Sequence, residues 1–116
     1  MSQLLSTQQA FSACLARLLD LIIHTEGWAV TLGEAYRPPE TALLYAEQGR
    51  GIADSNHPRS LAIDLNFFYN GHYVTDSARL EPFGRAWEGF HKLAAWGGRF
   101  TKPDGGHFSF VWQGVK

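Results

Sequence analysis

Residues 55–67 read SNHPRSLAIDLNF, and the rest of the fold can be worked out from this segment. From Leu61 to Phe67 the side chains alternate in character, which predicts a β-strand because successive side chains of a strand point to opposite faces. The apolar face carries Leu61, Ile63, Leu65 and Phe67, and the other face carries Ala62, Asp64 and Asn66. The strand is therefore expected to pack one side on a core, after a loop from Ile52 to Arg59.

Three further strands are predicted around this one. Asn70-Gly71 is a hairpin turn signal, and His72 to Thr75 would form the return strand. Upstream, Trp28 to Tyr36 is rich in β-forming residues, and the final segment, His107 to Trp112, alternates well. The hairpin favours a sheet that is mainly antiparallel.

Helical periodicity predicts three helices. The first has one apolar face, with Ser6 or Thr7 as its cap and Gly27 as its stop. That face consists of Phe11, Leu15, Leu18 and Ile22. Glu40 to Gln48 is predicted as a short helix, and a second long helix is predicted from Pro82 to Gly97-Gly98. The buried face of that long helix would carry Phe83, Trp87, Phe90 and Ala94. The order of elements predicts an α+β fold.

Length, composition and charge narrow the classes of function. The chain of 116 residues fits one domain, residues 1–116, and its 45% hydrophobic content can build a core. Ten Lys and Arg stand against eleven Asp and Glu, which argues against a general nucleic-acid binder and against electrostatic attachment to lipid. No unbroken apolar run is longer than the five residues Ala42–Ala46, so no membrane insertion is expected.

Cysteine usage and the N-terminal segment bear on location. Cys14 is the single cysteine, so no intrachain disulfide can form, and its place on the apolar helical face predicts a small core residue. The N-terminal segment lacks the basic region and pure apolar run of a signal peptide. We expect a soluble monomer made in the cytoplasm.

Two of the five histidines have carboxylates at suggestive spacings. His57 stands seven residues before Asp64, and Asp104 stands three residues before His107. If the final strand pairs beside the strand of Asp64, both histidines can meet that carboxylate. Two imidazoles and one carboxylate suit Zn²⁺ and leave a fourth position open for water. Asp104 would then be placed to take the water proton.

Spacing alone leaves an ordinary alternative open. Asp64 could pair with Arg59 or cap a turn, and His107 could be a plain strand residue. A His and an Asp seven residues apart occur often by chance, and on spacing alone this alternative is slightly favoured.

Several motifs together resemble one family. The run Ser55 to Asp64 resembles the S-x-H-x-x-G-x-A-x-D signature of the LAS-type metallopeptidases. That group includes D-Ala-D-Ala carboxypeptidases and dipeptidases, and phage endolysins that act as L-alanyl-D-glutamate peptidases. Its second signature, an acidic residue, two spacers and a His, is matched by Asp104 to His107. Trp96-Gly97-Gly98 resembles the W-G-G of the endolysin branch, and Tyr36 to Glu40 resembles the Y-R-[ST]-x-x-x-Q region.

The resemblance runs from about Tyr36 to Phe108, and it implies a fold and a site. The fold would be of the Hedgehog/DD-peptidase kind, a small antiparallel sheet packed with helices. Asp104 would act as general base and then as general acid. Arg37 would hold the scissile carbonyl oxygen or a substrate carboxylate, and Ser55 would line the substrate groove. The zinc ligands would be His57, Asp64 and His107.

Two positions depart from the family pattern. Ser60 stands where the family usually has Gly, and Ser would be mildly strained there if the site needs a positive φ. Gly106 stands where the endolysin branch often has Pro, which would loosen the loop but keep the spacing from Asp104 to His107. Neither departure removes a reactive group.

The implied function is a zinc-dependent peptidase that cleaves peptidoglycan stem peptides. Asp104 stands where the endolysin branch often has Asp and the other branches have Glu, which favours the L-alanyl-D-glutamate bond and a phage or prophage endolysin. Such a protein would act on the cell wall after release from the cytoplasm. The alternatives are a D-Ala-D-Ala carboxypeptidase or dipeptidase on the same scaffold, and a non-catalytic structural module that binds zinc.

Overall fold

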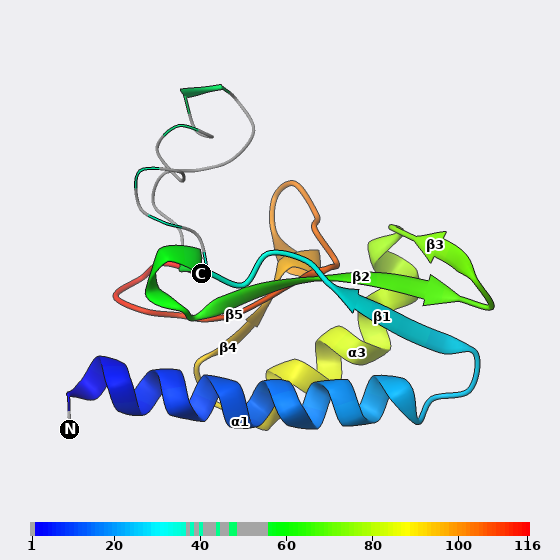
Figure 1. The fold of residues 1–116 in the computed structure, drawn as a ribbon, viewed down its shortest axis with the longest axis horizontal. Coiled ribbons are helices and arrows are strands. Elements are labelled where there is room, and N and C mark those ends of the chain that lie inside the picture. Colours follow the sequence, from blue (N-terminus) through cyan, green and yellow to red (C-terminus); the bar gives the residue numbers. More distant parts are fainter. Residues whose placement is uncertain (1, 37, 39, 41–43, 45–46, 49–55) are drawn as a thin grey trace.

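An antiparallel sheet lies at the centre of the molecule, as the computed structural model shows (Figure 1). The structure describes residues 2–36, 38, 40, 44, 47–48 and 56–116. The strands follow the order β1-β2-β5-β4, and β3 also pairs with β2. Their bounds are Trp28–Leu32 (β1), Ala62–Tyr69 (β2), His72–Val74 (β3), Ala94–Trp96 (β4) and His107–Phe110 (β5). The strand predicted from residues 61–67 is therefore the central one, with three partners.

Two long helices cover one face of this sheet (Figure 1). Helix α1 (Gln3–Ile23) and helix α3 (Ser77–Phe90) bury their apolar faces against it. The shared core includes Phe11, Leu18, Ile22, Ile63, Leu65, Phe67, Leu80, Phe83 and Trp87. The expected α+β class is confirmed, and so is the burial of the apolar face of the central strand.

The first helix begins earlier than the sequence predicted. Ser2 is the cap, and its side chain accepts a hydrogen bond from the backbone N–H of Leu5 at 3.0 Å. The predicted caps Ser6 and Thr7 lie inside the helix, where their hydroxyls donate to the carbonyl of Gln3. At the other end the helix closes at His24, before Gly27. Cys14 is buried, as its place on the apolar face predicted.

The second long helix also begins and ends at residues other than those that the sequence predicted. Asp76 caps it, because its carboxylate accepts from the N–H of Ala78, so the helix starts at Ser77 and Pro82 lies inside it. Proline removes a single interior hydrogen bond there, and the cap and the buried face outweigh that loss. The helix ends at Phe90, and Ala94 belongs to β4 instead of a helical face.

The remaining predicted elements need smaller corrections. Strand β1 ends at Leu32 instead of Tyr36, and β5 ends at Phe110 instead of Trp112. Strand β3 stops at Val74. In the predicted short helix Glu40–Gln48, the described residues Glu40, Leu44 and Glu47 are helical, and the residues between them lie outside the described part. Within the described part of the chain, no helix combines the length and apolarity that crossing a membrane requires.

Candidate active site

The pairing of β2 with β5 brings the first two candidate ligands together. In this antiparallel pair Asp64 lies directly opposite His107. The third candidate, His57, opens a short 3₁₀ helix, η1 (His57–Arg59), that leads into β2. Side chains of residues opposite each other in a ladder lie about 5 Å apart at Cβ, so this register alone places the carboxylate beside the imidazole.

The three side chains converge on one point. The His57 Nε2 atom lies 3.5 Å from one carboxylate oxygen of Asp64, and the His107 Nδ1 atom lies 3.3 Å from the other. The candidate ligand atoms of all three residues lie within 4.8 Å of one another. Ligands at about 2.0–2.1 Å from a tetrahedral zinc ion stand roughly 3.3 Å apart, so these separations suit a shared ion. The expected grouping of His57, Asp64 and His107 is thus present.

Backbone contacts orient the first histidine for such a role. The Nδ1 atom of His57 lies 3.1 Å from the carbonyl oxygen of Ala35, to which it can donate. In a neutral ring that donates through Nδ1, the lone pair that a metal ion requires lies on Nε2, the atom that faces Asp64. Metal-bound histidines commonly use their second nitrogen in this way. Only 3% of the His57 side chain is exposed, so its position is fixed by its surroundings.

Asp64 is held in its charged form. Burial by itself would raise the pKa of this carboxyl group, but hydrogen bonds from His107 and His57, together with the charge of those rings, outweigh burial and lower the pKa well below its usual range. About a third of the Asp64 side chain is exposed, whereas His107 is almost fully buried. The ionised carboxylate therefore forms the solvent-facing side of a site whose other walls are imidazole rings.

A buried asparagine fastens the loop that carries His57. Asn56 is fully buried, and its side-chain amide donates to the carbonyls of Phe110 and Val115. Its side-chain oxygen accepts from Arg59 at 3.1 Å. The loop is thus tied to the end of β5 and to the C-terminal residues. Sequence reasoning missed Asn56 because it occupies a variable position of the signature, and only its burial reveals its part.

The backbone at Ser60 resolves the first departure from the family pattern. Ser60 has φ 55° and ψ 39°, the left-handed conformation that favours glycine. The backbone N–H of Ser60 donates to the carbonyl of His57, which closes the short helix before β2 begins. The position of Ser60 therefore does need a positive φ in this chain, which meets the need with serine.

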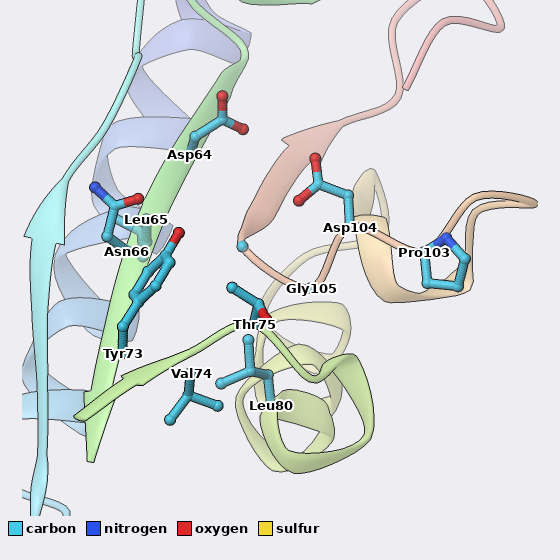
Figure 2. Close-up of a pocket in the computed structure, with 11 residues that line it drawn as sticks. Asp64, Leu65, Asn66, Tyr73, Val74, Thr75, Leu80, Pro103, Asp104 and Gly105 are labelled. Carbon is cyan, nitrogen blue, oxygen red and sulfur yellow. The ribbon is translucent and has the colours of Figure 1, made fainter. Parts of the chain in front are cut away.

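Asp104 stands at the edge of a pocket that it shares with Asp64. The pocket has a volume of about 310 Å³, and Figure 2 shows both carboxylates turned toward its same end, one from β2 and one from the loop before β5. Asn66, Tyr73 and Thr75 also line it. Asp104 is exposed and is outside the group of candidate ligands. A carboxylate so placed can exchange a proton with a molecule bound in the pocket.

The Trp-Gly-Gly segment holds the loop that carries Asp104. The indole N–H of Trp96 donates to the carbonyl of Gly105 at 2.8 Å, and the N–H of Asp104 donates to the carbonyl of Gly97 at 2.9 Å. A Cβ on Gly97 would overlap the carbonyl oxygen of Asp104 and come within 2.7 Å of the His107 Cβ. Glycine is therefore required where this turn packs against the site.

Gly106, the second departure from the family pattern, has a local reason as well. A Cβ at this position would lie 2.6 Å from the backbone oxygen of Leu65 in β2. The carbonyl of Gly106 also accepts from the N–H of Leu65 at 2.8 Å. Gly106 is therefore joined closely to the central strand, and the expected loosening of the loop relative to proline stays a prediction.

Two candidate site residues from the sequence, Arg37 and Ser55, lie outside the described residues. Of the other histidines, His24 ends α1 with its Nδ1 atom 2.8 Å from the carbonyl of Asp20, and His72 is exposed. His91 stacks on Phe110 with ring centroids 4.6 Å apart, and its Nδ1 accepts from the N–H of Leu93. These three act in the scaffold or face solvent, away from the ligand group.

Comparisons with known proteins agree with this geometry. Residues 48–110, more than half of the chain, match the family described as D-alanyl-D-alanine carboxypeptidase. Among solved structures, the chain is similar to the crystal structure of Serratia marcescens L-Ala D-Glu endopeptidase ChiX. The TM-score is 0.67 at 19% identity, and the match covers 90% of this chain and 84% of that one. At this identity the likeness shows the fold alone. The comparison with curated proteins gave no match.

The matched segment contains both of the sequence signatures and all three candidate ligands. A hydrolytic enzyme is therefore indicated, and the alternative of a purely structural zinc module falls away. The chain belongs to the D-alanyl-D-alanine carboxypeptidase family of M15 peptidases, and its class of activity is peptidoglycan peptide hydrolysis.

Proposed function

We propose that this protein is a zinc-dependent peptidase that cleaves the L-alanyl-D-glutamate bond of peptidoglycan stem peptides. The observation that carries the proposal is the convergence of His57, Asp64 and His107 beside a pocket that also contains Asp104. M15 peptidases are zinc-dependent, and the donor set of two imidazoles and one carboxylate is the set that zinc hydrolases use. The spacing of the three ligand atoms fits an ion of this size.

The residues divide the chemistry between them. His57, Asp64 and His107 would hold the zinc, which when bound lowers the pKa of water to about 7 and polarises the scissile carbonyl. The Asp104 carboxylate takes the proton from the attacking water and then delivers it to the nitrogen of the leaving D-Glu. Burial of both imidazoles keeps the ligand side of the site dry, which strengthens the electrostatic interactions there.

Two further residues complete the proposal on the strength of the family resemblance. Arg37 would hold the scissile carbonyl oxygen or a substrate carboxylate, and Ser55 would line the groove. Arg37 follows Ala35 by two residues in the sequence, and the Ala35 carbonyl is the partner of His57. A guanidinium entering the site from this segment would meet negative charge that develops on the substrate.

The choice of bond rests on three supports. Asp104 is an aspartate where the carboxypeptidase and dipeptidase branches have glutamate. The Trp96-Gly97-Gly98 segment resembles the endolysin branch, and it holds the Asp104 loop through the bonds of Trp96 and Gly97. The structural neighbour ChiX is named an L-Ala D-Glu endopeptidase. A role as a phage or prophage endolysin, made in the cytoplasm and acting on the wall after release, follows from the endolysin resemblance alone.

A peptidoglycan digest tests the proposal. Zinc-loaded protein is incubated with purified peptidoglycan, and the fragments are analysed by mass spectrometry. We expect new N-terminal D-Glu that disappears when a chelator is added. Intact stem peptides in the presence of fully zinc-loaded protein would refute the proposed activity.

A D-Ala-D-Ala carboxypeptidase is the second candidate, because the matching family carries that description. The same digest separates the two activities, since the carboxypeptidase releases free D-Ala and leaves the L-Ala–D-Glu bond intact. The endolysin role has its own test in cells whose outer membrane has been permeabilised. Added protein should lower the turbidity of the suspension, and the Asp104→Asn variant should not.

A further inference from the structure

A pair of aromatic side chains, the partly buried Phe68 and the exposed Tyr73, extends the face of β2 that carries Asp64. Asn66 and Phe68 follow Asp64 at two-residue intervals on this strand, so all three side chains share one face. Tyr73 of β3 lies opposite Phe68 in the antiparallel pair, and the two rings are 5.4 Å apart at an angle of 40°. Tyr73 is 61% exposed, which makes its ring a surface that water covers in the free protein.

This pair is continuous with the candidate active site. Tyr73 and Asn66 line the same pocket as Asp64 and Asp104. Figure 2 shows the Tyr73 ring leaning over β2 toward the pocket, while the Asn66 side-chain oxygen points to the same side. The Asn66 amide nitrogen donates to Thr31 of β1 at 3.2 Å, which fixes the orientation of the amide. A ligand could therefore extend from the metal ligands along β2 to the rings without leaving a continuous surface.

We propose that the Phe68–Tyr73 pair is a glycan subsite, which binds the N-acetylated sugar to which the stem peptide is attached. This inference rests on the proposed L-alanyl-D-glutamate peptidase activity. The faces of aromatic rings offer flat apolar area for the C–H faces of a sugar, at low entropic cost because the rings have few rotatable bonds. The oriented amide of Asn66 and the phenol of Tyr73 can bond to sugar hydroxyl and acetamido groups.

The distance between the scissile bond and the sugar in the substrate matches the distance between Asp64 and the Phe68–Tyr73 pair. Phe68 lies four residues beyond Asp64, which is about 13 Å along a strand. L-Ala is the first residue of the stem and joins the lactoyl group of the sugar, so its scissile carbonyl lies only about 4 Å from the lactoyl carbonyl. A disaccharide that begins there spans the pocket and reaches the rings. A carboxypeptidase would instead place the D-Ala–D-Ala bond at the metal. Four residues of the stem peptide, or about 14 Å, would then separate the scissile carbonyl from the lactoyl group. The glycan would therefore begin beyond the Phe68–Tyr73 pair.

Charge favours a neutral glycan over an anionic wall polymer. The Asp64 and Asp104 carboxylates stand at one end of the pocket, and the other polar side chains that line it, among the described residues, are an amide, a phenol and a hydroxyl, from Asn66, Tyr73 and Thr75. A phosphate-rich polymer would meet repulsion from Asp104 there. An N-acetylated disaccharide carries no charge when its lactoyl group is bound as an amide.

The test compares two substrates that differ only in the sugar. Zinc-loaded protein is given a disaccharide stem peptide and the same peptide with an acetyl group in place of the sugar, and kcat/KM is measured for each. We expect the wild-type protein to prefer the disaccharide substrate by roughly 3- to 10-fold, the effect of one aromatic contact. Equal values of kcat/KM for the two substrates would overturn the inference while leaving the proposed peptidase activity intact.

Three variants test whether the Phe68–Tyr73 pair causes the preference for the disaccharide substrate. Tyr73→Ala should reduce the ratio to about one, and Tyr73→Phe should keep most of the ratio because the ring remains. Tyr69→Ala is the matched control, since Tyr69 is a partly exposed tyrosine next to Phe68 on β2 and its side chain lies on the opposite face of the sheet. The ratio compares two rates on one preparation, so a smaller folded fraction cancels. A preference that survives Tyr73→Ala contradicts the assignment to this pair.

Binding without turnover keeps the inference testable if the peptidase activity itself fails. The zinc-loaded Asp104→Asn variant, labelled with ¹⁵N, is titrated with the GlcNAc–MurNAc disaccharide whose lactoyl carboxyl group is capped as an amide. We expect the largest shifts in the amide resonances of Asn66, Phe68 and Tyr73. Shifts confined to other strands, or no shifts at millimolar sugar, would refute the subsite whether or not any peptide bond is cut.

Discussion

Ser60 adopts a backbone conformation that costs an L-residue about 1–2 kcal/mol. Replacing it by glycine removes that cost but adds chain entropy to the unfolded state, worth about 0.5–1 kcal/mol. Ser60→Gly is therefore expected to raise the free energy of unfolding by about 0.5–1 kcal/mol, measured by urea denaturation. Ser60→Ala is the control, since alanine keeps the strain and should give no gain. A lower stability for the glycine variant would show that the serine side chain contributes more than its strain costs.

Asp104 should act on the proton without holding the metal, because it lines the pocket but stands outside the ligand group. We expect Asp104→Asn to lower kcat by 10²- to 10⁴-fold, the usual contribution of general acid–base catalysis. Zinc content by elemental analysis and the thermal midpoint should stay at wild-type values. Loss of zinc together with activity would instead make Asp104 a ligand, and full activity would exclude it as the acid–base residue.

The site residues themselves were only partly accessible from the sequence. The spacing of His57 and Asp64 could not exclude chance, and the decisive fact, the register that sets Asp64 opposite His107, depends on pairing between strands far apart in the chain. The family resemblance supplied that pairing indirectly. Asn56 and the carbonyl of Ala35 left no readable signal, because burial and backbone contacts carry their roles.

At the level of elements, the turn that follows β4 controls the loop of Asp104. Gly97→Ala places a methyl group against the backbone of Asp104, so the loop must shift. Displacements of about 1 Å in an active site can cost on the order of 10²-fold in rate, and we expect a loss of this size in kcat/KM. Gly89→Ala is the matched control, because a Cβ at this position in α3 meets no other group within 4 Å.

The Gly89→Ala variant should keep full activity and be slightly more stable, since alanine favours helix by about 1 kcal/mol over glycine. Activity assays on both variants, with circular dichroism to confirm the fold, test whether Gly97 keeps the Asp104 loop in place. Wild-type activity in Gly97→Ala would mean that the Asp104 loop tolerates displacement, and it would weaken the assignment of the Trp-Gly-Gly segment as its support.

Elements with a strong local sequence pattern were predicted well. Elements whose positions depend on packing between distant parts of the chain were not. The alternation of β2 and the Asn-Gly hairpin gave the central strand and its neighbour. Strand β4 was missed because three residues, Ala94–Trp96, carry no period, and Ala94 fell in phase with the helix before it. Its pairing with β5 is a long-range contact that local pattern does not contain.

For the molecule as a whole, the core and the candidate metal ligands are separate, which predicts how the protein responds to metal removal. The apolar core lies between the sheet and the two helices, while the ligands lie on β2, β5 and η1 and are held by strand register and by Asn56. The metal-free protein should therefore stay folded, unlike a zinc finger. Zinc at 100 times its Kd should still stabilise the folded state by about 2.7 kcal/mol through mass action.

For a domain of this size that gain corresponds to a rise in Tm of roughly 8–16 °C. The measurement is thermal unfolding by circular dichroism, with excess EDTA and then with graded zinc. His107→Ala removes one ligand and should lose most of the zinc-dependent rise, whereas His72→Ala, an exposed histidine on β3, should keep it. Because the rise depends on zinc concentration only if the ion binds the folded state, a Tm that is the same in EDTA and in excess zinc would exclude the three-residue site. A chain that unfolds in EDTA at room temperature would show instead that the ion, and not the core between sheet and helices, supplies most of the stability.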